Sequence, residues 1–266
     1  MSDAFPVFPV SGDAGSARRF GGIDRLYGAG ALVRLSAARV GVIGIGGVGS
    51  WVAEALARSG IGGLKLVDLD NIAESNINRQ IHALDATLGQ AKVDAMAARI
   101  QDINPHCRVD KVEDFLTPEN TAALLCDVDA VADAIDNVRA KIAIAVYCKR
   151  HRLPLLMAGG AGGKTDPRRI RVGDLAHTEQ DLLLSRVRAR LRREHGFSRE
   201  PGKNFGIEAV YSDEPMRRPA ACASGAPQGL SCAGYGSSMA MTACIGLFIA
   251  ARILEHLLRA HAGAGA

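Results

Sequence analysis

Short apolar runs rich in Val, Ile and Leu alternate along the chain with longer stretches in which apolar residues recur at helical spacing. The short runs predict strands, and the longer stretches predict helices. Strands are expected at 40–43, 64–67, 107–112, 130–135 and 153–158, and helices at 48–58, 89–103, 117–125 and 139–151. Elements that alternate in this order build a parallel sheet with helices on both faces. The expected fold class is therefore α/β, a Rossmann-like, doubly wound and mostly parallel sheet.

The pattern becomes less regular after residue 158. Two further strands are expected at 170–174 and 205–211, a basic helix at 180–194, and a mobile loop at 212–228 that is rich in Pro, Ala and Ser. The last helix, at 238–254, is strongly apolar. Its apolar run stops at Arg252, short of the roughly 20 residues that cross a bilayer. We therefore expect a buried core helix and no stable membrane association.

A glycine-rich turn follows the first predicted strand. Gly44, Gly46 and Gly49 form G-x-G-x-x-G, and Asp68 and Asp70 end the next strand. The first glycine allows a tight turn, the second lets the backbone approach a phosphate, and the third lets helix and strand pack closely. An acidic residue at the end of the second strand can bind ribose hydroxyls. With a strand before it and a helix after it, this turn predicts a nucleotide site. The alternative is a turn that needs glycine only for packing.

Four charged side chains lie where such a site could use them. Arg79 is in a polar run at 76–80, and Lys92 is in the first turn of a predicted helix. A lysine there opposes the helix dipole, so it is either a surface residue or a phosphate ligand. Asp136 follows a strand at the sheet edge that binds ligands, which predicts a metal or nucleotide contact. Asp133 is a candidate helix cap or buried hydrogen-bonding group.

These patterns predict one domain with two halves. Residues 18–158 form the nucleotide-binding half, and 159–258 form the substrate half, a C-terminal extension of the same domain. Residues 1–17 are expected to be a disordered leader, and 259–266 a flexible tail. A short amphipathic helix is expected around Leu32, Val33 and Leu35.

Charge and cysteine content narrow the classes of partner and compartment. The 266-residue chain has a formal net charge of +4, which permits an RNA partner without requiring one. Its six cysteines include no C-x-x-C pair, which argues against a four-cysteine zinc site and favours reduced cytoplasmic thiols. The N-terminus lacks the basic start and apolar run of a secretory signal. We therefore expect a cytoplasmic protein.

Two features of the second half allow both a structural and a functional interpretation. Cys232 lies near the start of the last helix, whose dipole would lower the pKa of its thiol, and the alternative is a buried, inert cysteine. The arginines of the basic helix either form a solvated face or contact an RNA backbone. They are Arg186, Arg188, Arg190, Arg192 and Arg193.

Five separated motifs together resemble the ubiquitin-activating-like adenylyltransferases, the HesA–MoeB–ThiF superfamily. They are GIGGVG at 44–49, DLD at 68–70, NINRQ at 76–80, Lys92, and DN at 136–137. Within that superfamily the chain is most similar to the group that dehydrates threonylcarbamoyladenosine in tRNA. The similar segments cover about residues 19–258 and include RFGGIDRLYG, NRQIHAL, INPHCRV, DAIDNVRAK, AGGAGGKTDP and SCAGYGSSM.

This resemblance implies ATP-dependent activation of a carboxylate. The substrate would be tRNA that carries threonylcarbamoyladenosine next to the anticodon. The enzyme would adenylate the threonyl carboxylate, release pyrophosphate, and let the carbamoyl group close a ring with loss of AMP. The implied cofactors are ATP and Mg²⁺, with a monovalent cation as a further candidate. The implied partners are a second copy of the chain and, as a candidate, a sulfur-relay protein.

The resemblance also implies roles for individual residues. Arg79 and Lys92 would neutralise phosphates, Asp136 would bind the magnesium, and Asp70 would hold the ribose. Cys232 is a further catalytic candidate. Arg19 and Arg25 are alternatives for an N-terminal arginine that reaches the partner subunit's ATP. The cofactor-binding set that the resemblance implies is Gly44, Gly46, Gly47, Gly49, Asp68, Asp70, Asn76, Arg79, Lys92, Asp136 and Asn137.

Three other functions are weighed against this one. Activation of a sulfur-carrier protein is possible, but the zinc-binding C-x-x-C pairs of many such activators are missing. The glycine turn alone would suit an NAD-dependent oxidoreductase, which does not need Arg79, Lys92 and Asp136. A non-catalytic tRNA-binding module is supported only by the basic helix.

Overall fold

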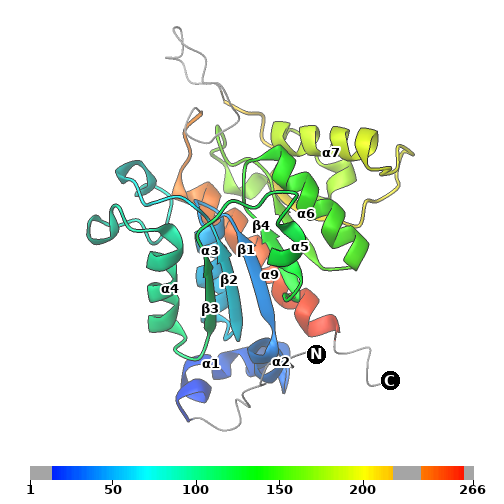
Figure 1. Cartoon of the computed structure of the whole chain (residues 1–266). Coiled ribbons are helices and arrows are strands. Elements are labelled where there is room, and N and C mark those ends of the chain that lie inside the picture. Colours follow the sequence, from blue (N-terminus) through cyan, green and yellow to red (C-terminus); the bar gives the residue numbers. More distant parts are fainter. Residues whose placement is uncertain (1–13, 218–234, 261–266) are drawn as a thin grey trace.

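In the computed structural model, residues 14–217 and 235–260 are described. A seven-stranded sheet with the order β3-β2-β1-β4-β5-β7-β6 forms the centre of the molecule (Figure 1). All neighbouring strands are parallel except β6 and β7, which are antiparallel. The strands are β1 (Arg39–Ile43), β2 (Gly63–Val67), β3 (Arg108–Val112), β4 (Ala130–Asp133), β5 (Leu155–Ala158), β6 (Ile170–Asp174) and β7 (Glu208–Ser212). The predicted fold class is thus confirmed.

Helices cover both faces of the sheet, and each face has its own hydrophobic core. One face packs against α3 (Gly49–Arg58), α4 (Lys92–Ile103) and α9 (Met239–Ala260). The other packs against α5 (Thr121–Leu125), α6 (Val138–His151) and α7 (Leu182–Glu194). Successive residues of a strand point to opposite faces, so Leu156 and Ala158 join the first core while Leu155 and Met157 join the second. This explains why β5, which is buried on both faces, is apolar throughout, whereas the edge strands β3 and β6 carry charged residues.

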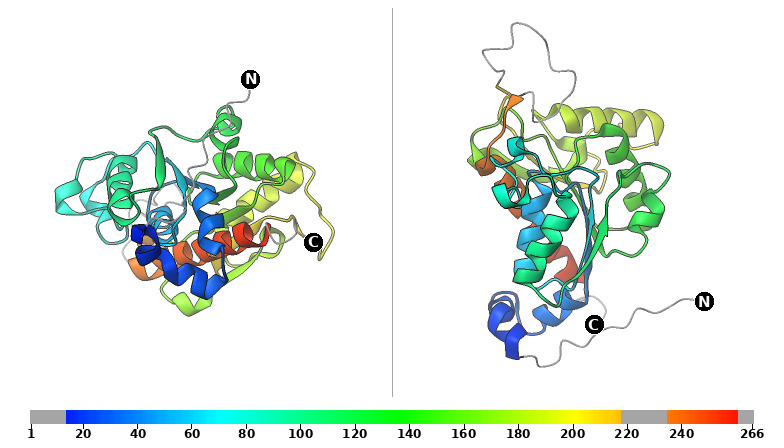
Figure 2. Two further views of the ribbon diagram at one scale, coloured as in Figure 1. Left: turned by 90° about the horizontal axis from the view of Figure 1, so that it is seen from below. Right: turned by 60° about the vertical axis from the view of Figure 1, so that its left-hand side comes forward.

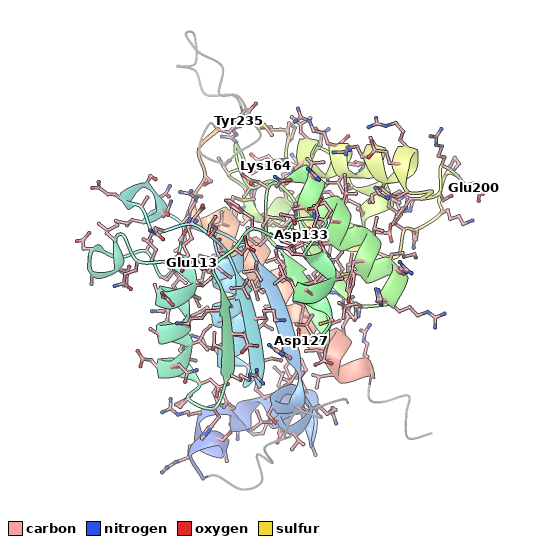
Figure 3. All side chains as sticks on the ribbon, viewed as in Figure 1. Glu113, Asp127, Asp133, Lys164, Glu200 and Tyr235 are labelled. Carbon is pink, nitrogen blue, oxygen red and sulfur yellow. The ribbon has the colours of Figure 1, made fainter. Side chains whose placement is uncertain are left out.

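The two ends of the sheet differ in what covers them. Asp127 precedes β4 and Asp133 ends it, and Asp133 lies above Asp127 in Figure 3, so the carboxyl ends of the parallel strands point upward in that view. Helices α1 (Ala14–Tyr27) and α2 (Ala31–Ala37) lie below the sheet, at its amino-terminal edge (Figures 1 and 2). Four short 3-10 helices lie in the described loops, at Glu74–Asn76, Asp85–Thr87, Pro167–Arg169 and Leu175–His177.

The predicted core helix near the C-terminus is confirmed. Met241, Ile245 and Ile249 of α9 are fully buried and join the core beside α3. A Cβ atom at Gly246 would lie 2.7 Å from the carbonyl oxygen of Val48, so this glycine lets α9 approach α3 closely. Residues Met239–Arg259 are long and apolar enough to cross a membrane by length and composition, but more than half of this stretch is buried within the protein.

Several predicted boundaries differ from the structure. Helix α4 begins at Lys92 and not at 89, because Gly89 has a φ of +81°. Strand β7 begins at Glu208 and not at 205, because Gly206 has a φ of +71°. The leader prediction is wrong for residues 14–17, which belong to α1, and the tail prediction is wrong for 259–260, which belong to α9. Residues 1–13, 218–234 and 261–266 lie outside the described chain, so most of the predicted loop at 212–228 lies there too.

Candidate nucleotide-binding site

A cavity of about 610 Å³ opens at the carboxyl edge of the sheet, between β1 and β4. Chain connections leave these neighbouring strands in opposite directions, since β1 leads through α3 to β2 and β4 leads through α6 to β5. Ligands of doubly wound sheets bind at such a switch point. The lining comes from the segments that follow β1 to β5, with additions from α4, α6, α7 and α9.

The glycine turn after β1 forms the floor of this cavity. Gly44 has a φ of +86°, and a Cβ there would lie 2.8 Å from Cγ2 of Ile135. A Cβ at Gly49 would lie 1.8 Å from the carbonyl oxygen of Gly44, so helix and strand could not approach each other as they do. Gly49 itself does not line the cavity, and its place agrees with the predicted packing role. At Gly46 the nearest atom would be 3.9 Å away, which leaves the backbone open to a ligand.

Asp68 fastens the end of β2 to the glycine turn. Its Oδ2 accepts a hydrogen bond from Ile45 N at 2.6 Å, and its Oδ1 accepts one from Asp70 N at 2.9 Å. Burial raises the pKa of Asp68, while Lys92 and the two backbone donors oppose that rise. Both oxygens of this carboxylate therefore hold the backbone of the turn in place, and they are less available to a ligand than those of an exposed residue. Asp70 is exposed at the cavity and can reach a nucleotide.

Lys92 is buried at the start of α4, with only 6% of its surface exposed. Its Nζ donates to Oδ2 of Asp70 at 2.7 Å and lies 3.8 Å from Oδ1 of Asp68. The interpretation of Lys92 as a surface lysine is therefore wrong. A buried ammonium is stable only beside anions, and Lys92 lines the cavity. It can exchange part of its contact with Asp70 for a phosphate oxygen.

Arg79 lies at the rim of the cavity and is held by its own loop. Its Nη1 donates to the carbonyl oxygen of Ser75 at 2.7 Å and to Oδ1 of Asn78 at 2.9 Å. The carbonyl oxygen of Arg79 accepts a hydrogen bond from Nε1 of Trp51 at 3.0 Å, which ties the loop to α3. The side-chain stem lies against Gly47, where a Cβ would be 3.2 Å from Cγ of Arg79. The loop thus presents a guanidinium beside the glycine turn.

Asp136 and Asn137 form the opposite wall, and both are exposed. Oδ1 of Asn137 accepts hydrogen bonds from the backbone N–H groups of Arg139 and Ala140, so this side chain caps α6. Asp136 therefore lies just before a helix N-terminus that faces the cavity, where an anion is stabilised. The side chain of Asn137 is thus occupied, whereas the carboxylate of Asp136 is available for a ligand.

The donor set of this wall fits a magnesium ion that is held together with a nucleotide. No group of three or more His, Cys, Asp or Glu side chains that could hold a metal occurs in residues 14–217 and 235–260. A magnesium ion at Asp136 would therefore take its other ligands from phosphate oxygens and water. Such a set, with one or two carboxylates, is usual for Mg²⁺ beside phosphates.

Besides Gly49, three residues of the predicted set do not line this cavity. Asn76 is buried outside the lining, and its Oδ1 accepts a hydrogen bond from Ala73 N at 3.1 Å, so it supports the loop and does not contact the cavity. Arg19 and Arg25 lie in α1, at the opposite edge of the sheet (Figure 1). Nη1 of Arg19 donates to the carbonyl oxygen of Ile103, at the end of α4. Within one chain neither arginine lines the cavity, and Cys232 lies outside the described residues.

The cavity also contains residues that the sequence did not single out. Gln80 is buried with no hydrogen-bond partner for its Oε1, and Phe115 is 59% exposed although it is aromatic. Gln80 lies within the polar run already noted at 76–80, which was the available signal. Phe115 lies between the predicted strand at 107–112 and the predicted helix at 117–125, where no pattern marked it. The backbone of 159–161 completes the lining.

The basic helix α7 uses most of its arginines within the chain. Arg188 donates to the carbonyl oxygen of Thr178, and Arg192 stacks 5.3 Å above the ring of Phe205. Arg190 and Arg193 pair with Glu194. This leaves Arg186 as the arginine of this helix that is exposed without such a contact among the described residues. The contacts favour the structural interpretation of the helix.

Two other features are separate from this site. A second cavity of about 770 Å³ lies at the amino-terminal edge, next to the ends of α6 and α9, and contains none of the predicted site residues. Cys107, Cys126, Cys148 and Cys244 are free thiols. Burial raises the pKa of Cys107 and of Cys148 to about 12, so these two are unreactive.

The protein is of the nucleotide-binding α/β class. It has a Rossmann-like sheet with a nucleotide-sized cavity at its switch point, which is lined by a glycine turn and by Lys92, Arg79 and Asp136. The profile of the ThiF family matches residues 22–263, and the chain belongs to that family.

Similar proteins and a similar crystal structure point to a narrower group within that family. The chain is 47% identical over 247 residues to the tRNA threonylcarbamoyladenosine dehydratase of Haemophilus influenzae, across 91% of this chain and 94% of that one. It is 44% identical over 251 residues to the Escherichia coli protein of the same name, with the same coverage. The crystal structure of the E. coli enzyme in complex with ATP has a TM-score of 0.87 and 42% identity, and covers 95% of this chain and 99% of that one.

Proposed function

We propose that this chain is an ATP-dependent dehydratase that cyclises threonylcarbamoyladenosine next to the tRNA anticodon. The observation that carries the proposal is the cavity, in which the glycine turn, Asp70, Arg79, Lys92 and Asp136 meet although they are far apart in the sequence. Proteins of that name in H. influenzae and E. coli match the chain along almost their full lengths, which supports the choice of substrate.

The reaction has two steps, and each conserves atoms and electrons. First, an oxygen of the threonyl carboxylate attacks the α-phosphorus of ATP, and the bond from that phosphorus to pyrophosphate breaks. Second, the carbamoyl group attacks the activated carbonyl carbon, and AMP leaves with the former carboxylate oxygen. A proton is released as the ring closes. The net change in the nucleoside is the loss of one water, and ATP becomes AMP and pyrophosphate.

The first step brings two anions together, so its main requirement is positive charge. Lys92 and Arg79 supply cations on one side of the glycine turn, and the backbone N–H groups near Gly46 supply dipoles. Asp70, which follows β2 and lines the cavity, would hold the ribose hydroxyls. On the opposite wall, Asp136 would hold magnesium, which neutralises the leaving pyrophosphate when bound. A thioester at Cys232 is not required by this chemistry.

The proposed assembly is a homodimer. Arg19 and Arg25 lie at the edge of the sheet away from the cavity, so only another copy of the chain could bring either of them to ATP (Figure 1). Mixing an Asp136→Ala chain with an Arg19→Ala or Arg25→Ala chain tests this assembly. Recovery of activity in the mixture above that of either inactive variant would support a shared site, and a monomer in light scattering would contradict it.

The remaining proposals concern surroundings and partners. A cytoplasmic location is supported by the free thiols of the described cysteines, and the absence of stable membrane association by the burial of α9. A sulfur-relay protein and a monovalent cation remain candidates to which no described residue is assigned.

The decisive experiment supplies the protein with ATP, magnesium and tRNA that carries threonylcarbamoyladenosine, followed by mass spectrometry of the nucleosides. We expect the modified nucleoside to lose the mass of one water, only when ATP is present. Unmodified tRNA and the Asp136→Ala variant are the controls.

Two outcomes would contradict the proposal in favour of its alternatives. Unchanged nucleosides, together with pyrophosphate exchange stimulated by a carrier protein that ends in Gly-Gly, would indicate sulfur-carrier activation. Binding of NADH with no affinity for ATP would indicate an oxidoreductase.

A further inference from the structure

Lys141 is a fully buried lysine in the second turn of α6, and its relative exposure is 0%. Its Nζ donates to Oδ1 of Asp133 at 3.0 Å and to the carbonyl oxygen of Ala158 at 2.9 Å, and lies 3.4 Å from the carbonyl oxygen of Asp133. The ammonium group is therefore surrounded by acceptors from two strands. It does not line the cavity and cannot touch a nucleotide.

The acceptors of Lys141 lie at the ends of two neighbouring strands. Asp133 is the last residue of β4, and Ala158 is the last residue of β5. The residues that follow Asp133, including Asp136, form one wall of the cavity, and Gly159–Ala161 form the adjoining wall. Lys141 thus joins the two points from which both walls begin.

Burial of this ion pair costs free energy that an apolar core would not lose. Both partners of the ion pair have 0% side-chain exposure, and Oδ2 of Asp133 has no hydrogen-bond partner. Apolar residues of similar volume often replace such buried pairs with no loss of stability. A buried pair that leaves a carboxylate oxygen unpaired is therefore better explained by the geometry it imposes than by the stability it adds.

A second buried carboxylate extends the connection into the substrate half. Asp181 is 6% exposed, its Oδ2 accepts a hydrogen bond from Gly160 N at 2.8 Å, and its Oδ1 caps α7 through Leu184 N at 2.9 Å. A Cβ at Gly159 would lie 2.3 Å from Oδ2 of Asp181, so this contact needs a glycine there. The segment after β5 is thus fixed from both sides.

We propose that Lys141 is a positioning residue of the nucleotide site, which fixes the ends of β4 and β5 so that Asp136 and the backbone of 159–161 face the phosphates of ATP. The part of this proposal that concerns catalysis rests on the proposed function. The part that concerns nucleotide binding does not, because it can be measured without tRNA.

Lys65 provides a matched control. It is also a buried lysine, it donates to the carbonyl oxygen of Leu124 at 3.0 Å, and it pairs with Asp127. Asp127 and Asp133 lie at opposite ends of the sheet, as Figure 3 shows. Lys65→Met therefore removes a buried ammonium as Lys141→Met does, but far from the cavity.

The experiment compares the wild type with Lys141→Met, Lys141→Arg, the double variant Asp133→Asn/Lys141→Met, and Lys65→Met. Lys141→Met leaves a buried carboxylate unpaired, and its melting temperature should fall by roughly 10 °C. The double variant removes both charges and should recover most of that loss. It therefore keeps the test valid if the single variant fails to fold.

In the folded double variant, we expect the affinity for ATP with magnesium to fall at least about fivefold, because the walls that face the phosphates have moved. The affinity for AMP, which lacks the β- and γ-phosphates, should change by less than about twofold. In the tRNA reaction, kcat should fall at least about tenfold, more than KM for ATP rises, since small misplacements cost more in the transition state. Lys141→Arg should recover part of kcat, and Lys65→Met should keep wild-type values.

A folded double variant with wild-type ATP affinity and wild-type kcat would overturn the proposal, as would an equal loss in Lys65→Met. If the wild type does not act on the tRNA, the proposed function fails. The affinities for ATP and AMP, measured by calorimetry, then still decide the positioning role by themselves.

Discussion

At the amino-terminal edge of the sheet, charged side chains neutralise one another, whereas at the carboxyl-terminal edge they surround a cavity. Arg39 pairs with Asp110 and Asp127, and Lys65 also pairs with Asp127. At the other edge, Asp136 is exposed at the cavity and Arg79 lies at its rim. The same residue types thus stabilise the fold at one edge and remain available to a ligand at the other. Substitution of Arg39, Lys65 or Asp127 should therefore affect mainly stability, and substitution of Asp136 or Arg79 mainly activity.

The largest effect on stability is expected in the glycine turn, where helix α3 packs closely against the end of β1. A Cβ at Gly49 would lie 1.8 Å from the carbonyl oxygen of Gly44, and backbone cannot yield as a side chain can. Gly49→Ala should lower the free energy of unfolding by at least about 3 kcal/mol. Urea unfolding measures this. Gly173→Ala is the control, because a Cβ there meets nothing within 4 Å, and equal stabilities of the two variants would contradict the explanation.

The next largest effect separates the two edges directly. Asp136→Ala should lower kcat/KM for the tRNA reaction by at least about 10³-fold with an unchanged melting temperature, because the carboxylate is exposed and would hold the magnesium. Asp127→Ala should do the reverse. It leaves Lys65 buried without its carboxylate and should destabilise the protein by roughly 1–3 kcal/mol while activity at 25 °C persists. Equal losses of activity in both variants would refute the distinction.

Arg79→Ala should lower kcat/KM about 10²-fold, because it removes one cation that opposes the repulsion between carboxylate and α-phosphate. Its guanidinium bonds only to its own loop in the described contacts, so the melting temperature should change by no more than a few degrees. Steady-state kinetics and a thermal melt test both statements. Arg193→Ala, a surface arginine of α7 paired with Glu194, is the matched control. Full activity in Arg79→Ala would show that the reaction does not need this guanidinium.

The smallest effect at neutral pH concerns a buried histidine near Lys92, which lowers stability only in acid. Burial, and then the charges of Lys92 and Arg99, lower the pKa of His82 to about 4, and neither ring nitrogen has a hydrogen-bond partner. The folded state thus disfavours the protonated form, whose pKa is about 6.5 in the unfolded chain. Stability is full above pH 6.5 and falls as the pH drops toward 4, by about 3 kcal/mol from this group. Urea unfolding of His82→Gln should lack this part of the pH dependence, and an unchanged pH profile would contradict the assignment.

Much of the fold could be predicted because its signals are local. β1 and α3 differ from their predicted ranges by one residue at the start, and β6 matches its range. The glycine turn was found because a strand, a turn and a helix follow one another within a short segment. Boundaries were wrong where a single positive φ interrupted an apolar pattern, as at Gly89 and Gly206.

The site was predictable for a different reason. Residues that follow parallel strands converge at one edge of a sheet, so Asp70 and Asp136 could be placed together from the strand pattern alone. Asn76 does not line the cavity and instead accepts a hydrogen bond from its own loop, because an amide in a polar loop can face a ligand or bind its own backbone, and the sequence is the same in both cases. Phe115 was missed since its segment has no periodicity.

The sequence by itself determined the order of strands and helices, the glycine turn and the types of charge at the strand ends, because each depends on residues close together in the chain. The tertiary structure alone decided which charged side chains are paired within the chain and which are free to bind a ligand. It placed Lys141 between Asp133 and Ala158, gave most arginines of α7 partners within the chain, and left Asp136 open to the cavity. A charge is available or neutralised according to what distant segments bring within about 4 Å of it, and no local pattern records that distance.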